Sequence, residues 1–427
     1  MDNSTNGSSF EYRKSRLDLA FSYGRRMTNP RPISIVTATT LFPNSGRPTH
    51  GIFVKTRLKK LLATGEAAAR VVAPVGWMPP LVAYPGAIHL RTIPPSETIE
   101  GIAVDHPRYL IIPKLGMSVT PYFLYRAMRH AIGAILASGQ PIDLIDSHYF
   151  YPDGVAAAWA ARDFGLPCVI TARGTDLNLI PQYALPRRMI QATAAGADGL
   201  ITVCAALKDR LVELGVSPTK VIVLRNGVDL DFFRPISREE ARRQFGITRR
   251  TLASVGHLID RKGHHHVIAA LPHMPDTDLI IAGDGERLSA LKGLAGRLGV
   301  ADRVRFLGAV DQETLKILYN AADALVLASS REGWANVLLE AMACGTPVIA
   351  SAVWGTPEVV ASPEAGVLMP SLDAEGVVRG SERLFQQLPA RTATRAYAEQ
   401  FGWEPTTEGQ LKLFRAILNQ RRNLSAR

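Results

Sequence analysis

Two glutamates, Glu332 and Glu340, stand eight residues apart in the segment 331–351, which reads REGWANVLLEAMACGTPVIAS. A carboxylate accepts hydrogen bonds through both of its oxygens, so it suits a pair of neighbouring hydroxyl groups such as those of a ribose or a hexose. In a continuous helix this spacing would rotate the two side chains by about 80° and separate them by about 12 Å along the axis. The two carboxylates would not touch, but both could line one side of an elongated ligand. Spacing alone leaves open the alternative that both are solvated surface residues.

The elements around these glutamates form a βαβ unit. Residues 322–328, ADALVLA, are a short apolar run typical of a buried parallel strand, and a polar turn follows them. A helix is predicted from Asn336 to Cys344, because Gly345 fits a left-handed C-terminal position and Pro347 prevents continuation. The free backbone amides at its N-terminus are a natural anion site, since the helix dipole adds to their unpaired N–H groups. The amides belong to Gly333, Trp334, Ala335, Asn336 and Val337. A phosphate site flanked by two acceptors for hydroxyl pairs indicates a nucleotide sugar.

A lysine in a second predicted loop has a charge suited to a diphosphate. The segment TLASVGHLIDRKGHHH places a strand before Gly256 and a helix after Gly263, so Lys262 lies where a strand-to-helix loop would aim an ammonium group into a cleft. Arg261 could supply a second cation. The three histidines at 264–266 also suggest a metal site, but adjacent residues on a helix point about 100° apart, so a solvated helix start is favoured.

The first half of the chain offers further candidates at predicted strand ends. The strand predicted at 32–40 runs into a Gly/Pro-rich loop, and ligands bind at the carboxyl end of such a strand in a doubly wound sheet. Gly51 in this loop either lets the backbone approach a ligand or simply serves a turn. His148 ends another predicted strand, where it is a candidate acceptor-site residue or a structural one.

Composition limits the classes of function. The chain has 427 residues, which is too long for one ordinary core and favours two domains. The formal net charge is +11, and the excess of Lys and Arg lies mainly in the first 200 residues. This basic half could face acceptor phosphates or an anionic membrane surface, or could be a solvated face. Nucleic acid is not an expected partner, because no binding motif for it accompanies the charge.

Localisation is predicted from what the sequence does not contain. The three cysteines lie in apolar surroundings and read as reduced core residues. Residues 1–30 contain no apolar core of a secretory signal, and no stretch approaches the ~18 apolar residues of a spanning helix. We therefore expect a cytoplasmic protein, with peripheral contact to the inner membrane face as an option.

The order of elements predicts the architecture. Strands alternate with helices through most of the chain, which predicts parallel sheets. We expect a flexible lead at residues 1–30, an N-terminal Rossmann-like domain at 31–228 and a C-terminal Rossmann-like domain at 229–400. Residues 401–427 are expected to form a terminal helix.

The stretch EGWANVLLEAMACGTPVIAS resembles the E-x7-E motif of retaining glycosyltransferases of family 4. The resemblance implies an α/β protein of the GT-B fold, with two Rossmann-like doubly wound domains facing a central cleft. Residues 31–228 would be the acceptor domain, residues 229–400 the nucleotide-sugar donor domain, and the helix at 401–427 would cross back to the N-terminal domain. It implies that Glu332 contacts the transferred sugar, that Glu340 binds the ribose and that Gly51 faces the donor phosphates. Gly308 and Val310 are the implied contacts to the nucleobase edge.

Two positions depart from the family pattern. The family's T-x-H-G-x-D pattern corresponds here to Thr-Ala-Arg-Gly-Thr-Asp at 171–176, so Arg173 replaces the usual histidine. We assign a charge-stabilising role to Arg173. Asp176 is an acceptor-side candidate. In the family's G-R-x4-K-G pattern, Lys262 matches but His257 takes the place of the arginine.

The resemblance therefore predicts a retaining, metal-independent hexosyltransferase without a cofactor. Glu332, Lys262 and Arg173 are its expected catalytic residues, a UDP- or GDP-sugar its donor, and a lipid-linked or polysaccharide glycan its acceptor. Two alternatives remain open: a nucleotide-sugar-binding protein without transferase activity, and a GT-B sugar epimerase.

Overall fold

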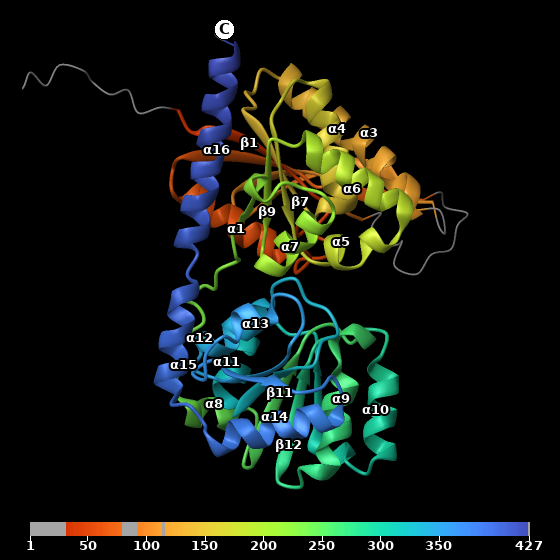
Figure 1. Cartoon of the computed structure of the whole chain (residues 1–427). Coiled ribbons are helices and arrows are strands. Elements are labelled where there is room, and N and C mark those ends of the chain that lie inside the picture. Colours follow the sequence, from red (N-terminus) through yellow and green to blue (C-terminus); the bar gives the residue numbers. More distant parts are fainter. Residues whose placement is uncertain (1–30, 79–91, 113–115, 426–427) are drawn as a thin grey trace, which may run out of the picture.

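The computed structural model describes residues 31–78, 92–112 and 116–425. The flexible lead predicted for residues 1–30 lies outside the described residues. Figure 1 shows two lobes, one above the other, joined along one side by the last helices of the chain. Each lobe has its own sheet, and the two sheets contain eight and six strands in the described residues.

The N-terminal lobe is built on the larger sheet. Its strand order is β10-β9-β8-β7-β1-β2-β5-β4, and its neighbours pair in parallel except β4 with β5. The strands are β1 Ile33–Ala38, β2 Ala67–Val72, β4 Ser96–Ile99, β5 Ile102–Asp105, β7 Leu144–His148, β8 Cys168–Ala172, β9 Gly199–Thr202 and β10 Val221–Val223. A separate parallel pair joins β3 Val75–Trp77 to β6 Arg108–Leu110.

Helices cover both faces of this sheet. The helices of the lobe are α1 Ile52–Ala63, α3 Gly116–Ala137, α4 Val155–Asp163, α5 Thr175–Asn178, α6 Ala184–Gly196 and α7 Ala205–Glu213. Apolar residues of α1 pack on one face with those of the C-terminal helix, whereas α3, α4, α6 and α7 pack on the other. Burial on both faces explains why strands such as β7 and β8 are fully buried along their length.

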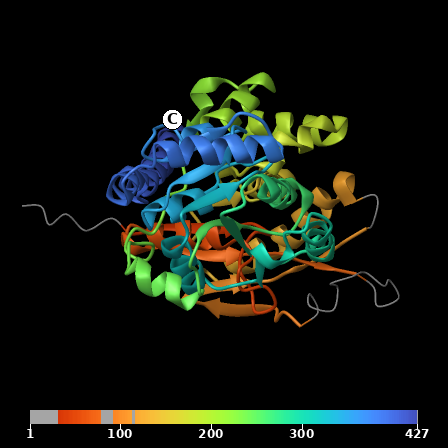
Figure 2. The same cartoon turned by 90° about the horizontal axis from the view of Figure 1, so that it is seen from below.

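The C-terminal lobe has an all-parallel sheet of order β13-β12-β11-β14-β15-β16. Its strands are β11 Arg250–Val255, β12 Thr277–Ala282, β13 Val304–Gly308, β14 Ala324–Leu327, β15 Val348–Ser351 and β16 Gly366–Met369. Its helices are α8 Arg238–Gln244, α9 His264–Ala270, α10 Leu288–Arg297, α11 Gln312–Ala321, α12 Asn336–Ala343, α13 Thr356–Val359, α14 Ala374–Gln386 and α15 Arg391–Ala398. Seen from below, helices lie on both faces of this sheet (Figure 2). The predicted fold class, two Rossmann-like α/β domains, is confirmed.

The last helix, α16 Glu404–Ser425, belongs in space to the N-terminal lobe (Figure 1). Its buried residues Leu411, Phe414 and Ile417 join the apolar cluster that includes Val54 and Leu58 of α1. Near its end, Arg421 pairs with Asp198 at 3.0 Å. The helix therefore ties the end of the chain to the first lobe, although the second lobe lies between them in sequence.

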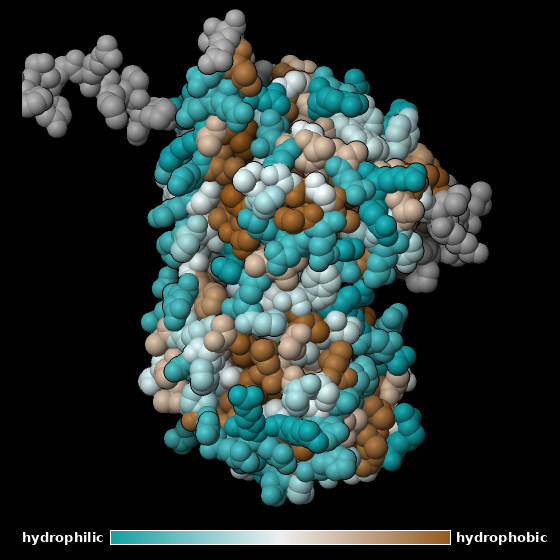
Figure 3. Space-filling view, viewed as in Figure 1, coloured by the Kyte–Doolittle hydropathy of each residue, from teal (hydrophilic) through white to brown (hydrophobic). Residues whose placement is uncertain are grey.

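The two lobes also touch directly. Glu358 of α13 accepts a hydrogen bond from the Ala205 amide at the start of α7, at 2.8 Å, and pairs with Arg225 at 2.6 Å. A single cluster of buried apolar side chains includes residues of both lobes, among them Ile145 and Leu325. Figure 3 shows a mostly hydrophilic surface with scattered apolar patches on both lobes.

One prediction about the histidine run was wrong. His264 is not solvated: it is 1% exposed, and its Nδ1 lies 2.8 Å from Ser254 Oγ. The reason is that α9 packs this first turn against β11. Among the described residues, no group of three His, Cys, Asp or Glu side chains is arranged to hold a metal. No helix in the described ranges is long and apolar enough to cross a membrane.

Candidate active site

The N-terminus of α12 lies at the boundary between the lobes. β14 ends at Leu327, an irregular segment follows, and α12 begins at Asn336 with no side chain capping its first turn. Gly333 in this segment sits directly against the other lobe, because a Cβ there would lie 1.9 Å from the Arg173 carbonyl oxygen. The positive end of the α12 dipole is thereby placed at the junction, next to the residues that follow β8.

Glu332 and Lys262 form an ion pair beside this helix. Lys262 Nζ lies 2.7 Å from Glu332 Oε1, and Arg261 NH1 lies 3.7 Å from the same oxygen. Glu332 is only 8% exposed. Burial by itself would raise the pKa of Glu332, but the charges of Lys262 and Arg261 outweigh it, so the pKa is lowered and the carboxylate is ionised at neutral pH.

The loop that carries Lys262 depends on a glycine. Gly263 has φ +69°, and a Cβ there would lie 1.8 Å from the Ala328 carbonyl oxygen at the end of β14. Only glycine permits this close approach of the two loops. The approach brings two cations from the loop after β11 to the carboxylate from the loop after β14, which are neighbouring strands.

Arg173 of the N-terminal lobe lines the same cavity at the junction as Glu332. It is 8% exposed, its guanidinium lies 5.2 Å from the centre of the Phe53 ring, and its NH1 donates to Asn226 Oδ1 at 2.8 Å. Burial lowers the pKa of Arg173 well below its usual value, and Arg57 lowers it further, whereas Asp146 opposes this shift.

The two acceptor-side candidates do not present free side chains to the junction. Asp176 is fully buried, and its carboxylate accepts hydrogen bonds from the amides of Phe150, Arg173 and Gly174. His148 is 1% exposed and its ring nitrogens face Asp146 and Arg173. Asp176 therefore acts on the backbone of residues 150, 173 and 174, and His148 contacts the side chain of Arg173, which itself lines the smaller of the two cavities described next.

Two adjoining cavities lie between the lobes. The smaller has a volume of about 210 Å³, and its lining includes Tyr149, Arg173, Arg261 and Glu332. This is below the ~300 Å³ at which pockets for drug-sized ligands begin, so it suits a single sugar ring better than a whole nucleotide sugar. The larger cavity has a volume of about 360 Å³. The two cavities share Phe53 and Asn336.

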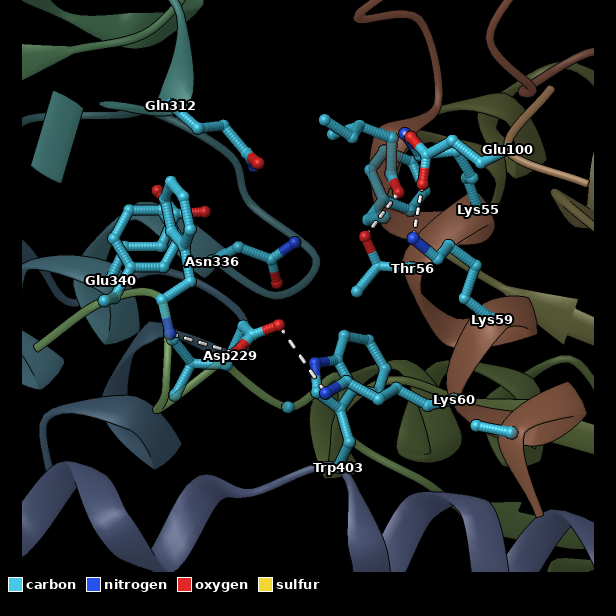
Figure 4. A pocket seen from close by; sticks show the side chains of 17 residues that line it. Lys55, Thr56, Lys59, Lys60, Glu100, Asp229, Gln312, Asn336, Glu340 and Trp403 are labelled. Carbon is cyan, nitrogen blue, oxygen red and sulfur yellow. Dashed lines mark hydrogen bonds and ion pairs between the residues drawn. The ribbon is translucent and has the colours of Figure 1, made fainter. Parts of the chain in front are cut away.

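The larger cavity brings Glu340 opposite a basic helix. Glu340, Asn336 and Gln312 line one side, and Figure 4 shows the lysines of α1 on the other. These lysines are Lys55, Lys59 and Lys60. Glu100 pairs with the first two, and Asp229 lies 3.5 Å from the third. The two cavities therefore connect the Glu332 carboxylate to Glu340 by way of Phe53 and Asn336, whereas Lys262 lines neither cavity and reaches the site through its ion pair with Glu332.

Glu340 has an unusual protonation equilibrium. Burial raises the pKa of Glu340 to about 7, although the Tyr319 hydroxyl, which donates to its Oε2 at 3.0 Å, opposes the shift. The folded state therefore retains this proton up to a higher pH than the unfolded chain, whose carboxyl titrates near 4.5. Stability contributed by this group is present at low pH and is lost as the pH rises from about 4.5 to about 7.

Glu340→Gln is expected to remove this loss. The variant should match the wild type in free energy of unfolding at pH 4 and exceed it by up to about 3 kcal/mol at pH 8. Thermal or urea unfolding of both proteins across this range measures the difference. Glu382→Gln, at an exposed position of α14, is the control and should show no such pH dependence. Parallel pH profiles for wild type and Glu340→Gln would contradict the assignment.

The remaining donor-side predictions concern backbone positions. Gly51 precedes α1 with φ +64°, and a Cβ there would lie 2.2 Å from the Leu41 carbonyl oxygen, so the turn itself requires glycine. Gly308 ends β13 with φ +73°, and Val310 is partly exposed in the loop before α11. None of the three lines either cavity.

Trp334 lines the smaller cavity and donates from its Nε1 to the Asn226 carbonyl at 2.9 Å. Ala335 and Val337 flank the start of α12, whose backbone is the predicted anion site.

The structure adds residues that sequence reasoning missed. Tyr149 lines the smaller cavity with φ +76°, an uncommon conformation for a non-glycine residue. The sequence could have indicated Tyr149, because it directly follows His148 at the end of a strand, where ligands bind such sheets. Asn226 links Arg173 to Asn336 of α12, where its Nδ2 lies 3.4 Å from the Oδ1 acceptor. Nothing in the local sequence pattern indicates that contact, because the three residues are far apart in the chain.

Two Rossmann-like lobes with an uncapped helix N-terminus, two cations and a buried carboxylate at their junction define the GT-B class of glycosyltransferase. The family model of glycosyl transferases group 1 matches residues 237–401, and the model of Glycosyltransferase Family 4 matches residues 88–232. The chain belongs to this group 1, family 4-like family of GT-B glycosyltransferases.

Relatives and solved structures agree with this assignment. The chain is 33% identical over 299 residues to a D-inositol 3-phosphate glycosyltransferase of Mycobacteroides abscessus, an alignment that covers 65% of this chain and 67% of the relative. Its identity to the enzyme of the same name from Mycolicibacterium smegmatis is 33% over 301 residues, which covers 66% of this chain and 68% of the relative. A sucrose-phosphate synthase from Thermosynechococcus elongatus is similar in fold, with a TM-score of 0.74, 22% identity and coverage of 91% of this chain and 100% of that chain. Anabaena HepE, solved in complex with UDP, has a TM-score of 0.68, 20% identity and coverage of 90% and 100%.

Proposed function

We propose that the protein is a retaining hexosyltransferase that uses a nucleotide sugar, with a UDP-sugar as the first candidate and a GDP-sugar as the second. The observation that carries the proposal is the Lys262–Glu332 pair at 2.7 Å, set beside the uncapped start of α12 and opposite Arg173. The fold neighbour HepE was solved with UDP and with UDP-glucose, which supports trying uridine donors first.

The two cavities suggest how such a donor would lie. In this proposal the sugar occupies the smaller cavity beside Glu332, and the nucleoside extends past Asn336 toward Glu340 in the larger one. The diphosphate then lies between them, near the first turn of α12. Lys262, released from its ion pair, turns its ammonium to the phosphate oxygens, and Glu332 is freed to accept hydrogen bonds from sugar hydroxyls.

The chemistry follows from this placement. Transfer breaks the bond between the anomeric carbon and a diphosphate oxygen, so negative charge grows on the leaving group. Fixed positive charge stabilises that change most effectively in a site with little water. Lys262, Arg261 and the α12 dipole supply it without a metal or cofactor in this proposal. The acceptor hydroxyl attacks the anomeric carbon on the face from which the diphosphate leaves, and its proton passes to the leaving phosphate oxygen. Because the new glycosidic bond forms on the same face as the bond that breaks, the configuration is retained in this proposal.

The acceptor is proposed to enter from the N-terminal lobe, where Tyr149 and Arg173 line the smaller cavity. A lipid-linked or polysaccharide glycan is the first acceptor class. The curated relatives are named for an inositol phosphate, so a phosphorylated polyol is a second class to be included. Both classes offer a hydroxyl group, and the phosphate of a lipid-linked glycan or of a phosphorylated polyol adds negative charge, which the basic N-terminal lobe would attract.

The test combines ligand binding with turnover. Purified protein is heated with UDP, GDP, ADP and their common sugars, because a ligand of the native state raises stability by about 2.7 kcal/mol at a hundred times its Kd. The stabilising donor is then incubated with acceptors of both classes, and the anomeric configuration of any product is read by NMR. A glycoside of retained configuration supports the proposal. Binding without turnover would favour a nucleotide-sugar-binding protein, and interconversion of the donor without an acceptor would favour an epimerase.

A membrane contact is proposed for the N-terminal lobe of a cytoplasmic enzyme. Helix α3 contains Arg126 and Arg129, both exposed, and no Asp or Glu in its 22 residues, although Arg129 also pairs with Asp163 of α4 at 2.8 Å. Such a surface suits the anionic lipids of the inner membrane face. Co-sedimentation with anionic vesicles that weakens in high salt would support this contact, and sedimentation equal to that with neutral vesicles would refute it.

A further inference from the structure

A continuous set of buried polar side chains leads from the last helix of the chain to the junction of the lobes. Each of its members is at most 8% exposed, although all carry strongly polar or charged groups. The members are Arg57, Asp146, His148, Arg173, Asn226 and Gln410. Because an unpaired polar group is costly to bury, most polar atoms of this set pair with one another, although Arg57 NH2, Asp146 Oδ1 and Arg173 Nε have no hydrogen-bond partner among the described residues.

The set begins at α16. Gln410 Nε2 donates to Asp146 Oδ2 at 2.8 Å, and the Gln410 Oε1 atom accepts from Arg57 Nε at 2.9 Å. Asp146 and His148 stand two residues apart on β7, so their side chains point to the same face of the sheet. His148 Nε2 lies 3.2 Å from Asp146 Oδ2. One carboxylate oxygen therefore binds both the last helix and the imidazole.

The geometry determines where the proton of His148 lies. Arg173 NH2 is 2.8 Å from His148 Nδ1, and a guanidinium can only donate hydrogen bonds, so Nδ1 must be the acceptor. The ring proton is then on Nε2 and points to Asp146. Burial, first of all, lowers the pKa of His148 to about 4, so the ring is neutral at physiological pH.

The set ends in the second lobe. Arg173 NH1 donates to Asn226 Oδ1 at 2.8 Å, and Asn226 Nδ2 faces Asn336 Oδ1 at 3.4 Å. Asn336 is the first residue of α12 and lines both cavities. Two contacts therefore orient the Arg173 guanidinium. One is the imidazole of His148, which Asp146 holds in turn, and the other is the side-chain amide of Asn226, which contacts α12 of the C-terminal lobe.

We propose that Asp146 and Gln410 are positioning residues for the transfer reaction, which hold Arg173 in the cleft through the neutral imidazole of His148. The inference rests on the proposed function and deepens it. It makes α16 a part of the support of the active site, and it gives His148 a positioning role in place of a direct contact with the acceptor.

The charges around Arg173 explain why its guanidinium needs these supporting contacts. Arg57 is buried in the same network and disfavours a second cation, whereas Asp146 and Asp176 favour it. The carboxylate of Asp176 is occupied by backbone amides, which leaves the guanidinium nitrogens to His148 and Asn226. Without Asp146, the Nε2–H group of the imidazole would lose its charged acceptor, and Arg173 would lose a countercharge.

The first test is Asp146→Asn, which removes the charge but keeps the shape of the side chain. We expect kcat to fall by about 10- to 100-fold, the size typical of a displaced supporting group, with the Kd of the donor nucleotide unchanged. The double variant Asp146→Asn/His148→Phe should be no slower than the slower of the two single variants, because both changes remove the same chain of contacts to Arg173. Asp323→Asn removes an ion-paired carboxylate of the C-terminal lobe and should leave kcat unchanged.

A second test does not depend on turnover. Nitrogen-15 NMR of histidine-labelled protein should show His148 as the neutral Nε2–H tautomer from pH 6 to 8. Gln410→Ala should alter that signal and lower kcat in a protein whose circular dichroism shows that it is folded, although its melting temperature should fall because Arg57 and Asp146 lose a buried partner. An Nδ1–H tautomer, or multiplicative effects in the double variant, would overturn the proposal. If Asp146→Asn does not fold, Gln410→Ala decides the question by the same two readouts. An inactive wild type with the expected tautomer would instead refute only the proposed function.

Discussion

Replacing Lys262 with alanine is expected to lower kcat/KM by about 10²- to 10³-fold, the loss typical of removing one preorganised group that stabilises developing negative charge. The ammonium lies 2.7 Å from Glu332, which stands four residues before the start of α12, where the proposal places the leaving diphosphate. The loss should appear in both kcat and the affinity for the nucleotide diphosphate, because the charge acts on the phosphates before and during the transfer. Steady-state kinetics and UDP titration of the same preparations separate the two.

The controls for Lys262 test charge, fold and position. Lys262→Arg keeps the positive charge and should recover part of the activity, although its planar group fits the site differently. Lys412→Ala removes an exposed lysine of α16 and should leave the kinetics unchanged. Because Lys262→Ala leaves Glu332 with only the more distant Arg261, a decrease in melting temperature is also expected. Full activity in a folded Lys262→Ala protein would contradict the proposed site.

The second large effect is expected for Glu332→Gln. The amide keeps the size of the side chain but removes the charge that pairs with Lys262 and Arg261. If Glu332 holds the hydroxyls of the sugar through the transition state, kcat should fall by about 10²-fold or more while UDP still binds. Binding of UDP is expected to be as tight as in the wild type, because Lys262 no longer has a competing carboxylate.

Glu340→Gln is the matched comparison, since it makes the same chemical change eight residues further along the motif. It should act mainly on the affinity for the nucleoside part and less on kcat, because Glu340 lies in the larger cavity away from the transferred sugar. Equal effects of the two substitutions on kcat and on nucleotide affinity would contradict the separate roles. An unaffected rate in Glu332→Gln would remove that residue from the mechanism.

Local sequence signals predicted the parts of the site that come from single loops. The helix after residue 335 and its C-terminal glycine follow from capping and turn preferences, and α12 indeed runs from Asn336 to Ala343 with Gly345 at φ +78°. The same kind of signal placed Lys262 in a loop at the end of a strand. Parallel strands present such loops at one edge of the sheet, so the contact between Lys262 and Glu332 could have been predicted from the order of strands and helices.

The surroundings of Arg173 were not accessible in this way. The sequence showed only that an arginine stands where the resembling family has a histidine. Its partners come from β7, from the segment between the lobes and, through Asp146, from α16. Contacts between residues separated by 25 to 264 positions depend on how helices and lobes pack, and a local pattern carries no record of that packing.

His264 shows the same limit in the opposite direction. Three histidines in a row indicate a polar helix start, yet the first of them is buried against β11 because of the face that α9 turns to its sheet. The sequence by itself therefore determined the alternation of strands and helices, the GT-B resemblance and the loops that carry Glu332, Glu340 and Lys262, since each depends on residues close together in the chain. Only the tertiary structure decided which polar groups are buried, which charges face each other across the cleft and which helix supports Arg173, because those outcomes depend on desolvation and on contacts between distant segments.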